Sequence, residues 1–106
     1  MGTFRREYEP SIPLSQEELY EMIEHLPSND LKNTSIKRFK GYTSGGSIML
    51  SLGDFVIYVN NPKKSDIPIT VESESWRCPN FGVVKERLES LLKFRLDEVP
   101  KVVKIY

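Results

Sequence analysis

The stretch from Ser47 to Asn60 limits the possible folds of this chain more than any other part of the sequence. Its first half alternates, with Ile48, Leu50 and Leu52 on one side and Ser47, Met49 and Ser51 on the other, as a strand with one buried face requires. Gly53 and Asp54 then suit a two-residue type II′ turn. The run from Phe55 to Val59 does not alternate, which predicts a central strand covered on both faces. The stretch therefore predicts a hairpin in the middle of a sheet.

Two helices are expected, one before and one after this hairpin. Ser15 and Glu18 have the spacing of a capping box, and an apolar stripe follows at Leu19, Met22, Ile23 and Leu26. Pro27 ends that helix, and we expect the polar stretch 28–34 to be a loop. Pro79 suits the first position of the second helix, whose buried stripe is expected at Phe81, Val84, Leu88, Leu91 and Leu92.

Four further segments have the composition of strands, namely 3–8, 35–42, 67–71 and 101–106. We expect segment 3–8 at an edge of the sheet. Pro68 places segment 67–71 at an edge too, or else lies among the first residues of that strand. The predicted order is β-α-β-β-β-β-α-β with an antiparallel middle. This is a single α+β domain over residues 1–106, with two layers, a mainly antiparallel sheet and both helices on one face.

Composition narrows the class of protein. Hydrophobic residues make up 39% of the chain and charged residues 28%, the balance of a globular protein. Basic and acidic residues both number 15, so the net charge is zero, which removes the strongest argument for a dedicated binder of nucleic acid or membrane surfaces. A single cysteine allows no internal disulfide and favours a reducing compartment. With no apolar run of membrane-spanning length and no secretion signal, we expect a cytoplasmic protein without a cofactor.

Cys78 is a candidate nucleophile, because it stands where a helix is expected to begin and Arg77 precedes it. The positive end of a helix dipole and an adjacent cation both favour the thiolate. Arg77, Cys78 and Pro79 followed by a helix resemble the sulfur-carrier proteins of the TusA family, and this resemblance implies a cysteine that carries persulfide sulfur. It covers only residues 77–88, and that family places its cysteine much earlier in the chain. The alternative is a cysteine that serves as a helix cap or a small apolar filler.

The distribution of charge predicts an interaction surface. Residues 7–30 contain seven acids and no lysine or arginine, and the first helix carries four of these acids, at Glu17, Glu18, Glu21 and Glu24. An acidic face of this kind steers a basic partner into contact. Trp76 and Arg77, in a segment expected to be an exposed loop, are residue types that anchor interfaces. The alternatives are a solvated helix face and a tryptophan folded back onto the core.

The segment 32–42 has the opposite charge and is a candidate surface for single-stranded nucleic acid. It combines cations with aromatic rings that stack on bases, at Lys32, Lys37, Arg38, Phe39, Lys40 and Tyr42. The alternative is a solvated outer face. His25 has no second histidine or cysteine at ligand spacing, so no zinc site is expected, and its place in the last helical turn suits the negative end of the dipole.

These observations rank three functions. The first is a non-enzymatic protein-binding domain, most concretely a bacterial immunity or inhibitor protein that neutralises a toxin, such as a basic nuclease, by covering its active surface. The second is a thiol-dependent enzyme or sulfur carrier that uses Cys78. The third is a binder of RNA or single strands that uses residues 32–42. We expect no metal and no membrane contact, and the sequence does not indicate an oligomeric state.

Overall fold

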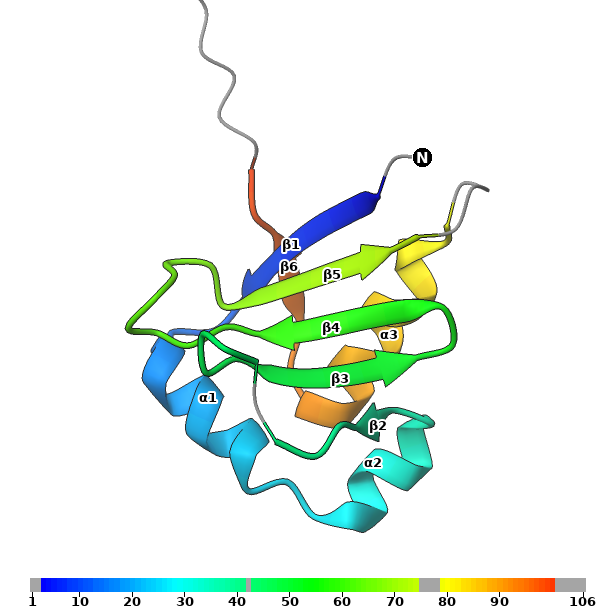
Figure 1. The fold of residues 1–106 in the computed structure, drawn as a ribbon, viewed down its shortest axis with the longest axis horizontal. Coiled ribbons are helices and arrows are strands. Elements are labelled where there is room, and N and C mark those ends of the chain that lie inside the picture. The colour runs from blue at the N-terminus through cyan, green and yellow to red at the C-terminus, as the bar shows by residue number, and fades with distance from the viewer. Residues whose placement is uncertain (1–2, 42, 75–78, 101–106) are drawn as a thin grey trace, which may run out of the picture.

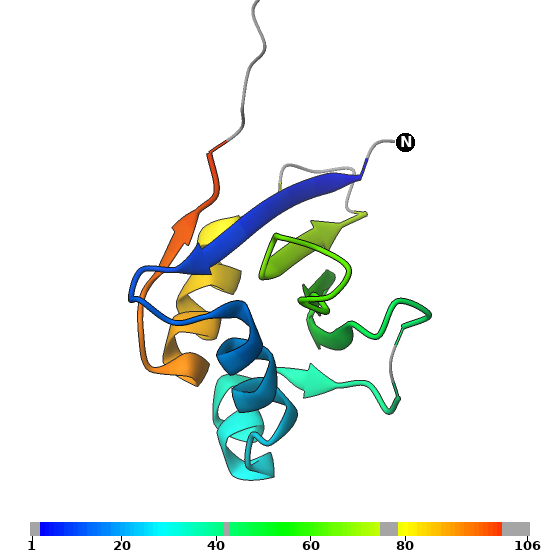
Figure 2. The same ribbon diagram turned by 90° about the vertical axis from the view of Figure 1, so that its left-hand side faces the viewer.

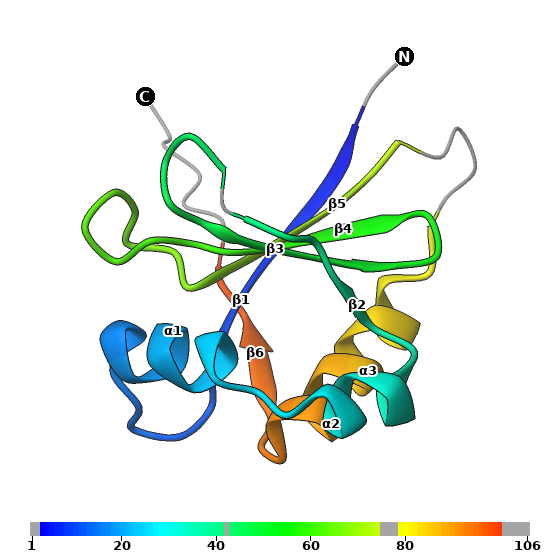
Figure 3. The same ribbon diagram turned by 60° about the horizontal axis from the view of Figure 1, so that its bottom comes forward.

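The computed structural model describes residues 3–41, 43–74 and 79–100. These residues form nine elements in the order β1 (Phe4–Pro10), α1 (Gln16–Glu24), α2 (Ser28–Thr34), β2 (Lys37–Arg38), β3 (Ile48–Leu52), β4 (Phe55–Val59), β5 (Ile69–Ser73), α3 (Phe81–Leu92) and β6 (Leu96–Glu98). The six described strands make one antiparallel sheet in the order β2-β3-β4-β5-β1-β6 (Figure 1). The three described helices all lie on the same side of it (Figure 3). The expected α+β fold is confirmed.

The hairpin of β3 and β4 has the expected register and turn. Leu52 pairs with Phe55, so that Gly53 and Asp54 form the turn. Gly53 has a φ of +56° and Asp54 has no positive φ, as a type II′ turn requires. β4 is an interior strand between β3 and β5, as expected. The expectation that both of its faces are covered is wrong, because the helices cover one face only and Val56 and Tyr58 on the other face are half-buried.

The core fills the space between the inner face of the sheet and the helices. Alternate strand residues point into it and are at most 1% exposed, namely Ile48, Leu50, Ile57, Val59, Ile69 and Val71. α3 buries the whole predicted stripe of Phe81, Val84, Leu88, Leu91 and Leu92. α1 buries Leu19 and Ile23. Both predicted helices therefore place their apolar stripes as the sequence indicates.

The ends of the helices differ in part from expectation. The capping box of α1 is confirmed, since the Glu18 amide donates to Ser15 Oγ at 3.1 Å and the Ser15 amide donates to Glu18 Oε1 at 3.4 Å. α3 begins later than Pro79 suggested, because Asn80 is its N-cap and its Oδ1 accepts the Gly82 amide at 3.1 Å. The amide side chain of Asn80 satisfies a free N–H of the first turn, which a proline cannot do.

Residues 28–34 form the helix α2, so the prediction of a loop there is wrong. This segment has one apolar residue, Leu31, and therefore lacks the periodic stripe by which helices are found in sequences. Ser35 ends the helix in the left-handed conformation, with φ of 61°, and the Ile36 amide donates to the Leu31 carbonyl at 3.2 Å. α2 packs against α3. A short helix of this kind is held by tertiary contacts and by its C-terminal turn rather than by its own propensity.

Three strands also depart from the prediction. β1 is not an edge strand, because it lies between β5 and β6 and leads directly into α1 (Figure 2). β5 begins at Ile69, immediately after Pro68, and is an interior strand, so the edge placement is wrong and the proline precedes the first residue. The strand that follows α3 is β6, before Pro100, whereas the predicted strand 101–106 lies outside the described residues.

The outer edge of β6 is partly blocked by α3. The Leu96 amide, which points away from β1, donates to Glu89 Oε2 at 2.8 Å. A side chain that occupies an edge amide in this way prevents another strand from pairing there. In the part of the chain that the structure describes, no helix has both the length and the hydropathy needed to cross a membrane.

Candidate partner-binding surface

The acidic side of α1 faces away from the core. Leu19 and Ile23 are buried, so Glu17 and Glu21, one turn apart on the opposite side of the helix, are exposed. Glu18 is exposed too, but its carboxylate is bound to the Ser15 amide in the capping box. Glu24 is half-buried and its Oε1 lies 3.8 Å from His25 Nε2. Glu17 and Glu21 are therefore the two carboxylates that α1 presents most openly.

Two side chains of α1 fasten the helix to the loops at one end of the sheet. Gln16 Nε2 donates to the Ser65 carbonyl at 2.9 Å, and Tyr20 Oη donates to the Gly46 carbonyl at 2.6 Å. These bonds connect residues that are 49 and 26 positions apart in the sequence. They hold the loop 60–68 and the turn 43–47 beside the acidic face of the helix.

A hollow of about 300 Å³ lies between α1 and the loop 60–68. Its lining combines two carboxylates, an aromatic ring, a proline, an amide and an amine, from Glu17, Tyr20, Glu21, Asn61, Pro62 and Lys63. The ring of Tyr20 cannot rotate out of the hollow without breaking the bond from its hydroxyl to the Gly46 carbonyl. The hollow is therefore preformed, with negative charge on the helix side and a single amine on the loop side.

Gly46 is required for the close packing of the two loops beside this hollow. Its φ is +80°, and a Cβ at this position would lie 2.7 Å from Asn61 Nδ2. The same amide group of Asn61 donates to the Gly45 carbonyl at 3.1 Å. Any side chain at position 46 would push Asn61 away and would also disfavour the left-handed backbone. The glycine pair that the sequence marks as a turn thus also shapes the wall of the hollow.

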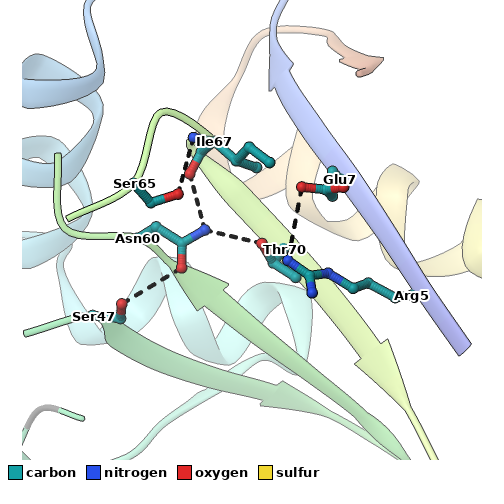
Figure 4. Close-up of polar contacts among 7 residues, drawn as sticks. All are labelled: Arg5, Glu7, Ser47, Asn60, Ser65, Ile67 and Thr70. Carbon is teal, nitrogen blue, oxygen red and sulfur yellow. Dashed lines mark hydrogen bonds and ion pairs between the residues drawn. The ribbon is translucent and has the colours of Figure 1, made fainter. Parts of the chain in front are cut away.

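Asn60 fixes the other side of the same loop to the sheet (Figure 4). Its Nδ2 donates to the Ile67 carbonyl and to Thr70 Oγ1, both at 2.9 Å. Thr70 is only 4% exposed, so this bond satisfies a hydroxyl that is removed from water. The loop 60–68 is consequently anchored at Asn60 to β5 and at Ser65 to α1, which gives the hollow a firm wall.

The basic residues of segment 32–42 do not share one surface. Lys37 pairs with Ser51 and Arg38 with the buried Leu50, so the two side chains leave β2 on opposite faces. Arg38 Nη1 donates to the carbonyls of Glu24 at 2.7 Å and Ile23 at 3.3 Å. The cation that stabilises the C-terminus of α1 is thus Arg38, whereas the side chain of the predicted His25 is 76% exposed. Phe39 and Lys40 are exposed, and Lys32 lies on α2.

Trp76, Arg77 and Cys78 lie outside the described residues, as does Tyr42. The interface role predicted for Trp76 and Arg77 and the nucleophile role predicted for Cys78 therefore stay predictions. Among the described residues, no group of three or more histidine, cysteine, aspartate or glutamate side chains is placed to hold a metal ion.

The outer face of the sheet is a second surface, which the sequence-based ranking did not include. The register places Met49, Tyr58, Thr70 and Glu7 in one row across this face and Ser51, Val56, Glu72 and Arg5 in the next. Arg5 Nη2 lies 3.8 Å from Glu7 Oε2, an atom that is buried and has no hydrogen-bond partner among the described residues (Figure 4). The unbroken apolar run of β4 was the signal of this surface.

Comparison with known proteins finds no matching protein-family model, no similar curated protein and no similar solved structure.

Proposed function

We propose that this protein is a non-enzymatic protein-binding domain that uses the acidic side of α1 to bind a basic partner. The observation that carries this proposal is the pair of exposed carboxylates of Glu17 and Glu21 beside a preformed hollow. Its most concrete form is an immunity or inhibitor protein that covers the active surface of a basic toxin such as a nuclease. A cytoplasmic location and a contact by Trp76 and Arg77 belong to the same proposal.

The lining of the hollow suits the side chain of a lysine or an arginine. The cationic group would lie between Glu17 and Glu21, and the aliphatic stem would pack against the ring of Tyr20 and against Pro62. Because the bond from Tyr20 to the Gly46 carbonyl holds the ring in place, little conformational freedom would be lost on binding. The hollow thus offers both charge and apolar contact to a basic residue.

Carboxylates on a helix surface act chiefly on the rate of encounter. Exposed charges of opposite sign raise the association rate and add salt dependence, whereas the buried contacts set the lifetime of a complex. Lys63, which lines the loop side of the hollow, opposes a basic partner. The proposal therefore predicts that removing the Lys63 amine strengthens the complex.

The test is capture of partners from cells of the source organism with the tagged chain and with two charge-reversal variants. Glu17→Lys/Glu21→Lys alters the hollow, and Asp54→Lys/Glu86→Lys makes the same change in net charge at exposed positions elsewhere. We expect a basic protein that is retained by the wild type and by the control, is lost from the helix variant, and binds more tightly to Lys63→Ala. Equal retention by both charge-reversal variants would exclude α1 as the contact.

A further inference from the structure

The outer face of the sheet has an apolar centre. The buried side chains of β3, β4 and β5 alternate with Met49, Val56 and Tyr58, which therefore point to the side that the described helices leave uncovered (Figure 3). All three are half-buried, so each still has surface that a partner can cover.

The sequence of β4 is typical of a strand that is covered on both sides. Its five residues, FVIYV, contain no polar side chain other than the hydroxyl of Tyr58. An antiparallel strand with one face in water alternates between apolar and polar residues, whereas a strand between two layers does not. Within the described chain only one layer is present. The composition of β4 thus points to a second layer that comes from another chain.

The two ends of the outer face carry opposite charge. Lys37 is exposed on β2 at one end. At the other end, Glu7 and Glu9 of β1, Glu72 of β5 and Asp97 of β6 share the outer face, and Arg5 is paired with Glu7. A two-fold interface brings the same patch of two copies together, so it needs a patch that is complementary to itself. A basic end, an apolar centre and an acidic end satisfy this requirement.

We propose that a second copy of this chain covers the outer face of the sheet. The two sheets pack face to face about a two-fold axis near Tyr58, as in a β-sandwich, and Lys37 of each copy lies against the acidic end of the other. This interface is separate from the hollow beside α1, so the inference does not rest on the proposed function.

The test is sedimentation of the purified chain over a wide range of concentration, with four variants whose folding is checked by circular dichroism. Val56→Lys puts a charge in the centre of the outer face, and Val83→Lys is the matched control, since Val83 is 44% exposed on α3. Lys37→Glu and Glu9→Lys each reverse one end of the face. We expect a wild-type dimer, a rise in its dissociation constant of at least about tenfold for Val56→Lys, and no change for Val83→Lys.

The charge variants test the arrangement of the two copies. Lys37→Glu and Glu9→Lys alone each place like charges together and should weaken the dimer, whereas an equal mixture of the two restores opposite charges at both contacts. Recovery of the dimer in the mixture would support the two-fold arrangement. A wild type that stays monomeric at the highest concentration, a dimer that Val56→Lys leaves intact, or a mixture as weak as the single variants would overturn it.

Discussion

The two faces of the sheet differ in what covers them, although the same strands supply both. On the inner face, Leu50, Ile57 and Val71 form a row that is fully buried under the helices. One residue away along each strand, Ser51, Val56 and Glu72 form a row on the face without helices. The inner face determines the stability of the fold, and the outer face and the edges of the helical layer are left for interactions. The predictions below test this division.

The largest difference is expected between neighbouring residues of β4. Ile57→Ala removes a fully buried side chain and should lower the free energy of unfolding by about 3 kcal/mol through lost burial and a residual cavity. Val56→Ala should cost less than about 1 kcal/mol at low protein concentration, where the proposed dimer is dissociated. Urea unfolding measures both values. Equal losses would show that the two faces of β4 are equally covered.

The two ends of β3 give the same contrast between a packed and an open position. Gly46→Ala should cost about 2 kcal/mol, because it combines a disfavoured left-handed backbone with a clash against Asn61. Gly53→Ala, whose Cβ would meet no atom within 4 Å, should cost only the backbone term of about 1 kcal/mol. Thermal unfolding of the two variants compares them directly. A smaller loss at position 46 than at position 53 would contradict the close approach of the loops.

Lys37 and Arg38 sharpen the comparison within one short strand. Arg38→Met removes the two bonds to the end of α1 and should cost about 1.5 kcal/mol, whereas Lys37→Met should change stability by less than about 0.5 kcal/mol. Amide hydrogen exchange in α1 should rise in the Arg38 variant only. Equal exchange in both variants would mean that Arg38 does not stabilise this helix.

The smallest effect concerns Tyr8 on the inner face and appears only at alkaline pH. Burial, and secondarily the nearby Glu98 carboxylate, raise the pKa of the Tyr8 phenol above its ordinary value of 10.0, although Arg6 opposes the shift. Above pH 10.0 the unfolded chain loses this proton before the native chain does, so stability falls as pH rises through the native pKa. Tyr8→Phe should remove this part of the alkaline loss in urea titrations. An unchanged pH profile would contradict the assignment.

Much of the fold follows from the sequence because local signals and burial agree. The capping box of Ser15 and Glu18, the stripe of α3 and the Gly53 turn are local patterns, and the structure confirms each of them. α2 could not be predicted in this way, since its packing against α3 and its left-handed Ser35 replace a periodic stripe. The interior place of β1 was also hidden, because the neighbours of a strand depend on the whole chain.

The candidate surface could be predicted only in part. The acidity of α1 is visible in the sequence, but the hollow depends on Tyr20 and Gln16 reaching loops far along the chain. Likewise, the charges of Lys37 and Arg38 are adjacent in sequence, and only the register of β2 shows that they point to opposite faces. The run FVIYV was correctly assigned to a central strand, but its second cover does not come from the described chain.

The central claim is that α1 binds a basic partner and that the outer face binds a second copy. Light scattering on the purified complex measures both at once. The account predicts a dimer with partner bound for the wild type, a dimer without partner for Glu17→Lys/Glu21→Lys, and a monomer that keeps its partner for Val56→Lys. A Glu17→Lys/Glu21→Lys variant that still carries the partner would contradict it.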